Sequence, residues 1–134
     1  MTKSKDSNDS INAATCLLLS IAFADEKLDA KETSIIKEVI SDFFSLSKEK
    51  ANSFYEDAID NVKASTDLFK FGKVLNDQFT HQDKIDFIGC IFEVAFIDGE
   101  LHYIESHRIK LIANILNLEH SDLIKSKMEI KRFL

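Results

Sequence analysis

Two stretches of the chain decide its fold, AFADEKLDAKE at residues 22–32 and AFIDGELHYIE at residues 95–105. Aligned at an offset of 73 residues, they are identical at five of eleven positions. Each follows an apolar segment with helical spacing and leads into another, so each contains a polar elbow between two predicted helices. We call residues 25–29 the first elbow and residues 98–102 the second elbow. The repetition predicts two copies of one helical unit.

The apolar pattern around the elbows predicts an all-α fold of about seven helices. Apolar residues recur at intervals of three and four along segments at about residues 11–24, 30–44, 48–63, 67–79, 82–97, 104–116 and 121–132. The first and fifth segments are apolar most of the way round, so we expect two central helices packed against each other. Each unit comprises a helix, an elbow, a helix, a turn and a helix. Residues 66–80 form a helix that connects the units.

The repeat extends beyond the elbows. At the same offset, Ile36 aligns with Ile109 and Val39 with Ile112, so the core face of the helix after each elbow recurs. Leu46 and Leu118 then mark the following turn in each unit, with a slip of one residue.

The composition supports this fold class and excludes others. The chain has 134 residues, no proline and three glycines, which leaves too few turn-forming residues for a β-sandwich or barrel. Its length predicts one domain, which we place at residues 11–134, behind a polar tail of residues 1–10 that we expect to be flexible. The formal net charge of −6 argues against a nucleic-acid partner, since nucleic-acid binders present a basic face.

The sequence also bears on cellular location. The polar start has no apolar segment of the secretory kind, and the apolar segment 13–24 is shorter than the ~20 residues that span a bilayer. We therefore expect a cytoplasmic protein without a transmembrane segment. Cys16 and Cys90 lie in apolar helical patterns without a Cys-x-x-Cys motif, so we expect reduced core cysteines. Their similar positions in the two units leave open whether they approach each other.

The elbows and the helix starts that follow them carry the candidate functional residues. In both copies an aspartate is followed four residues later by aspartate or histidine, and three residues after that by glutamate. One interpretation is a capped helix start, which suits Asp29 and Glu32 better than His102. The other is a cation site, because hard cations need several oxygen ligands from a short, turned backbone. The candidate metal ligands are Asp25, Asp29, Glu32, Asp98, Glu100, His102 and Glu105.

The second elbow is the better metal candidate. From Asp98 through Gly99 to Glu105 it matches the second half of an EF-hand loop. Apolar residues stand where the first ligands of such a loop belong, so we expect a weaker site, or one shared by both elbows, instead of a separate EF-hand. In the first elbow, the positive charge of Lys27 partly offsets the negative charge of the neighbouring carboxylates. The expected cofactor is a divalent cation, calcium, zinc or manganese, with His102 favouring zinc.

These motifs resemble the signature Ala-x-x-Asp-Gly-x-Leu/Ile-x-x-x-Glu of the tellurite-resistance TerB family and the related domain of the DjlA co-chaperones. The second copy matches at Ala95, Asp98, Gly99, Leu101 and Glu105, and the first at Ala22, Asp25, Leu28 and Glu32. Glu26 replaces the glycine in the first copy. The resemblance covers about residues 11–130 and implies an all-α domain with an acidic patch that binds a metal ion or a partner. The resemblance also implies that the protein takes part in stress-response complexes at the inner face of the membrane. It implies no established catalytic activity.

The sequence therefore predicts a non-enzymatic TerB-like binding module whose elbows bind a divalent cation. No phosphate-binding glycine-rich loop, zinc-ribbon spacing or nucleophile elbow occurs. His81, His107 and His120 are expected at the surface. The alternative is a co-chaperone-type adaptor domain without metal, which docks a basic or helical protein partner and is peripheral at the inner membrane.

Overall fold

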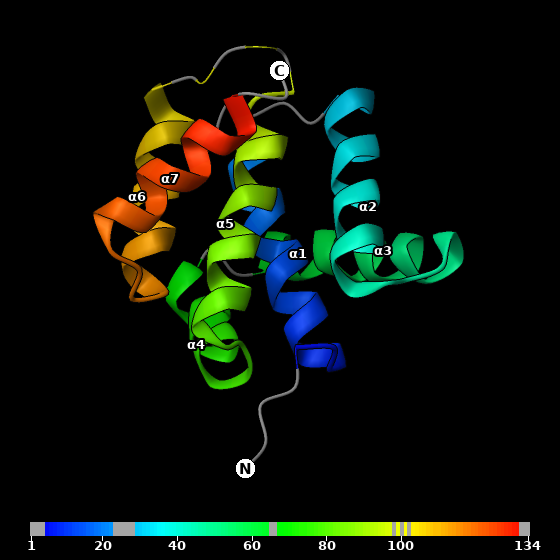
Figure 1. Cartoon of the computed structure of the whole chain (residues 1–134). Coiled ribbons are helices and arrows are strands. Elements are labelled where there is room, and N and C mark those ends of the chain that lie inside the picture. Colours follow the sequence, from blue (N-terminus) through cyan, green and yellow to red (C-terminus); the bar gives the residue numbers. More distant parts are fainter. Residues whose placement is uncertain are drawn as a thin grey trace.

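Seven helices form the part of the chain that the computed structural model describes, which is residues 5–22, 29–64, 67–97, 99, 101 and 103–131 (Figure 1). They are α1 (Asn8–Ala22), α2 (Ala30–Phe44), α3 (Lys48–Ala64), α4 (Leu68–Gln78), α5 (His81–Ala95), α6 (Tyr103–Ile115) and α7 (His120–Lys131). These described residues contain no strand. The all-α prediction is confirmed.

The helix bounds reproduce the repeat found in the sequence. α1 and α5 each have 15 residues, and both their first and their last residues are 73 positions apart. α2 and α6 also begin 73 residues apart, while α3 and α7 begin 72 apart. The predicted slip of one residue therefore lies in the turn between the second and third helix of each unit.

That turn has the same geometry in both units. Ser45 is the C-cap of α2, and Asn117 lies two residues after α6. Both residues have left-handed φ values, of 55° and 60°. The next residue is a leucine in each case, whose N–H donates to a carbonyl five residues earlier, from Leu46 to Ser41 and from Leu118 to Ala113, both at 2.9 Å. This is a Schellman ending with its apolar residue in place.

The start of α1 differs from the prediction. The helix begins at Asn8, three residues before the predicted start at Ile11. Ser10 is buried and accepts a hydrogen bond from Ser7 Oγ, whose own oxygen accepts from the Ser10 N–H. Lys5 Nζ lies 4.6 Å from the centre of the Phe43 ring. The end of the predicted segment 11–24 lies outside the described residues.

The core is built around α1 and α5, as the sequence predicts. α1 is buried at every position from Ser10 to Ala22 except Asn12, which is half-buried. α1 packs against α5, and each central helix also packs on helices of the other unit, α1 on α6 and α2 on α5. α4 connects the units and packs along α1 and on α6. Among the helices described, none has the length and apolar character required to cross a bilayer.

Candidate functional site

The helix ends that flank the two elbows lie at the same end of the molecule. The C-terminal ends of α1 and α5 and the N-terminal ends of α2 and α6 all point to the upper end in Figure 1. Four of the predicted ligands, Asp25, Asp98, Glu100 and His102, lie outside the described residues. The structure describes the other three, Asp29, Glu32 and Glu105.

Asp29 is the N-cap of α2. Its Oδ1 accepts a hydrogen bond of 2.8 Å from the N–H of Glu32, which satisfies one of the free donors at the helix start. The capped-junction interpretation is therefore confirmed for the first unit. Asp29 itself is exposed.

Glu32 and Glu105 occupy matching places in the repeat. Each is the third residue of the helix after an elbow, and each side chain is only 9% exposed. Carboxylates are rarely so buried without compensation, and the positive end of the helix dipole favours a negative charge in the first turn. The sequence thus brings two buried carboxylates to the elbow end of the molecule.

The second elbow contains the glycine of the TerB signature. Gly99 has φ of +86°, and its N–H donates to the Phe96 carbonyl oxygen at 2.8 Å. A side chain is strained in this conformation, which explains the use of glycine here.

Arg108 connects the two units next to the elbows, a contact that we did not predict. Its guanidinium donates a hydrogen bond of 3.2 Å to the carbonyl oxygen of Ser20, in the last turn of α1. A cation at the C-terminal end of a helix is favourable for the helix dipole. The sequence does contain a signal for this contact. Arg108 is a charged residue at a repeat position where the first unit has the apolar Ile35.

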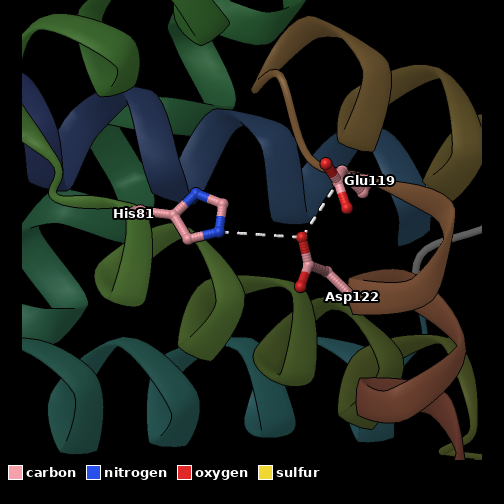
Figure 2. Close-up of polar contacts among 3 residues, drawn as sticks. All are labelled: His81, Glu119 and Asp122. Carbon is pink, nitrogen blue, oxygen red and sulfur yellow. Dashed lines mark hydrogen bonds and ion pairs between the residues drawn. The ribbon is translucent and has the colours of Figure 1, made fainter.

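The described titratable groups do not cluster into a metal site. Within the described ranges, no group of three or more His, Cys, Asp or Glu side chains is placed to hold a metal ion. Figure 2 shows a polar contact between α5 and α7, where Asp122 Oδ2 lies 3.7 Å from His81 Nε2 and accepts from the Glu119 N–H at 3.2 Å. Asp122 therefore caps the start of α7. The three predicted surface histidines, His81, His107 and His120, are exposed.

Both cysteines are free thiols, as predicted. Burial raises the pKa of Cys16 to about 12, and the Lys70 ammonium opposes the shift. Burial also raises the pKa of Cys90 to about 12, with Glu93, Asp86 and Asp42 adding to the effect. A thiol with so high a pKa is a poor nucleophile at neutral pH.

Two helical units around a central helix pair, with an acidic elbow in each, define a duplicated all-α domain of the TerB type. The family model for the tellurite resistance protein TerB matches residues 12–128. The chain belongs to the TerB family. No curated protein and no solved structure matches it.

Proposed function

We propose that this TerB domain is a non-enzymatic binding module whose paired elbows bind a divalent cation. The observation that carries the proposal is the pair of buried glutamates, Glu32 and Glu105, at matching repeat positions beside the two elbows. Together with the aspartates of the elbows, they supply the oxygen ligands that hard cations require. Calcium, manganese and zinc are the candidate ions, with His102 as the nitrogen ligand that favours zinc.

The absence of catalysis is part of the proposal. The high pKa values of Cys16 and Cys90 argue against a thiol nucleophile. No sequence motif supplies another nucleophile or a phosphate-binding loop.

The cellular role follows from the family. The name of the matching family is the tellurite resistance protein, which supports a role in a stress response. We place that role in the cytoplasm, at complexes on the inner face of the membrane, through protein partners and not through a membrane-spanning helix.

The test is the effect of cations on thermal unfolding. A ligand that binds only the folded state raises the melting temperature, so millimolar calcium, zinc or manganese is expected to stabilise the wild-type protein. Asp98→Asn with Glu105→Gln, which remove charge with little change of shape, are expected to abolish that shift. Asp57→Asn with Glu56→Gln, on the exposed surface of α3, are the matched control and are expected to keep it.

Each result is judged by the cation-induced shift and not by the melting temperature itself, because Glu105→Gln changes a buried residue. Isothermal titration calorimetry on the same variants gives the affinity directly. A wild-type protein that none of the three cations stabilises, or an elbow variant that responds like the α3 control, contradicts the proposal.

A further inference from the structure

The repeat makes it possible to compare the surroundings of the two central helices. Four residues of α1, Ala13, Cys16, Leu17 and Ser20, lie on one side of the helix at helical spacing, and all are buried. We call them the α1 face. At the offset of 73 they correspond to Asp86, Gly89, Cys90 and Glu93 of α5, which we call the α5 face.

Among the described residues, the second unit has no helix that corresponds to α4. It packs along α1 and on α6. The contact with α6 is close, since Asn76 Nδ2 donates to the Ile115 carbonyl oxygen at 2.9 Å. Cys16 of the α1 face is near α3 and α4, because its Sγ lies 3.9 Å from the Ala58 carbonyl oxygen and its pKa responds to Lys70 of α4.

No described helix covers the corresponding place on the second unit. A helix related to α4 by the repeat would pack along α5 and on α2, and within the described part of the chain no helix does so. Asp86 and Glu93 are exposed, and Gly89 and Cys90 are half-buried. In Figure 1 the front of α5 is visible between α7 on one side and α2 on the other.

The α5 face is recessed. It forms one wall of a groove of about 290 Å³, and the other wall is α7, with Asp122, Lys125, Ser126 and Glu129. Of the charged residues that line this groove, Lys125 is the only base beside four carboxylates.

Gly89 lines this groove, and no described residue packs against its open side. Glycine inside a helix is less favourable than alanine, so a reason for it is expected. Gly72 of α4 has one, because a Cβ at that position would overlap Ile115 Cγ2. A Cβ at Gly89 would meet nothing within 4 Å. A glycine there allows another backbone to approach α5 closely.

The charge of the α5 face differs from that of the α1 face. On α5, Asp86 and Glu93 stand at the positions that Ala13 and Ser20 have on α1. On α2, Asp42 stands at the position that Ile115 has on α6. Ile115 is the residue against which Gly72 of α4 packs. Burial raises the pKa of Glu93, and the carboxylates of Asp42 and Glu38 raise it further. Positive charge in this place would relieve the repulsion between these carboxylates.

We propose that the α5 face, with its groove against α7, binds a basic helix of a partner protein, along the side of α5 that corresponds to the covered side of α1. A helix fits because both walls of the groove are helices, whose exposed side chains recur at helical spacing. Lysine or arginine side chains of the partner pair with Asp86 and Glu93, and its backbone passes over Gly89. This surface consists of residues outside the elbows, and its binding does not require a cation.

The experiment uses a fluorescent, alanine-based helical peptide of about 15 residues with lysine and arginine along one side. Fluorescence anisotropy is measured in the presence of a metal chelator, which keeps the result independent of cation binding at the elbows. The wild-type protein is expected to bind the peptide, and more weakly as the salt concentration rises. A peptide of the same composition with two central prolines, which cannot form the helix, is expected not to bind.

Two variants test shape and charge separately. Gly89→Leu fills the groove without changing any charge, and because the site is open the fold is expected to be kept, as circular dichroism will show. It is expected to weaken binding about tenfold or more, the loss typical of blocking a central contact. Asp86→Lys with Glu93→Lys are expected to do the same, whereas Asp57→Lys with Asp60→Lys, an equal charge change on the exposed surface of α3, are expected to keep binding.

Several outcomes overturn the proposal. Binding that survives Gly89→Leu, or that both charge variants weaken equally, shows general attraction to an acidic protein. Equal binding of the proline peptide excludes a helical partner. A wild-type dimer in sedimentation that Gly89→Leu dissociates would show that a second copy of the chain covers the face. A wild-type protein that does not bind the helical peptide excludes the basic helix.

Discussion

At the scale of single residues, two glycines with the same backbone geometry have opposite surroundings. Gly72 in α4 is packed against Ile115, and Gly89 in α5 faces open space. Replacing both with alanine removes the same entropic disadvantage of glycine in a helix. The difference between the two variants then measures the packing alone.

We predict opposite effects on stability. Gly89→Ala is expected to raise the free energy of unfolding by about 0.5–1 kcal/mol. Gly72→Ala is expected to lower it by about 1–3 kcal/mol, because the new methyl group displaces a β-branched side chain with little rotamer freedom. Urea denaturation followed by circular dichroism measures both, at unchanged m-value.

A double-mutant cycle identifies the cause of the Gly72→Ala effect. In the background of Ile115→Ala the overlapping methyl group is gone, so the added cost of Gly72→Ala is expected to be smaller. If alanine at the two glycine positions changes the stability in the same direction, the close approach of α4 and α6 is not the reason for Gly72.

Sequence reasoning at this scale identified some residues and missed others. Asp29 was predicted as a cap because its chemistry and its place before an apolar periodic segment are local signals. The contact of Arg108 was missed, because its partner Ser20 is 88 residues away. A contact over such a distance along the chain is decided by how helices pack, which spacing within one helix does not reveal.

At the scale of helices and turns, the predicted segments agree with the observed helices to within a few residues at the ends that the structure describes. The largest difference is the start of α1, where Ser10 is buried and bonded to Ser7 although the sequence there is polar. Apolar periodicity marks the buried face of a helix but not the polar turn with which it begins. The capping residues locate these starts better, as Thr80 and Asp83 do for α5 with a reciprocal capping box.

The start of α2 provides a prediction at this scale. Asp29→Ala removes the acceptor for the Glu32 N–H and is expected to lower the free energy of unfolding by about 1 kcal/mol. Asp29→Ser, which retains a capping oxygen, is expected to have little effect. Thermal unfolding in the presence of a chelator measures both changes without a contribution from bound cations.

Asp57→Ala on the exposed surface of α3 is the control, with an expected change within about 0.5 kcal/mol. Equal melting temperatures for Asp29→Ala and Asp29→Ser would show that the cap contributes nothing measurable. The Asp29 carboxylate would then have no measurable role in the stability of α2, and its proposed role as a cation ligand would remain.

At the scale of the whole molecule, the repeat predicted which helices correspond and that α1 and α5 form the centre. It did not predict the uncovered face of α5. The offset of 73 residues relates the units to each other, but α4 stands outside the repeat, and only its packing shows which unit it covers. For the candidate site, the sequence supplied the acidic residues, and the helix directions showed that the helix ends flanking the two elbows lie at one end of the molecule.

The buried thiol of Cys16 reports on opening of the whole molecule. It is fully buried, and its pKa is raised to about 12 from an ordinary value of 9.0. In a Cys90→Ser variant, where Cys16 is the only cysteine, modification by a thiol reagent at pH 8 is expected to require global unfolding. The free energy of opening from the labelling rate is then expected to equal that from urea denaturation.

Added urea is expected to accelerate labelling with the slope of the global transition. Fast labelling with no dependence on urea would mean that α1 separates from α3 and α4 by a local motion. In that case the centre of the first unit is less firmly held than the burial of α1 indicates.

The hydrogen bond from Arg108 to Ser20 makes the two halves of the chain non-interchangeable. The reciprocal positions are Ile35 and Glu93, an isoleucine that has no proton to donate and a glutamate on the exposed side of α5. A protein assembled from two first halves would lose this contact, because the isoleucine side chain has no N–H to donate to the carbonyl oxygen of the partner helix. A first half alone is therefore expected to pair less stably with itself than with the second half.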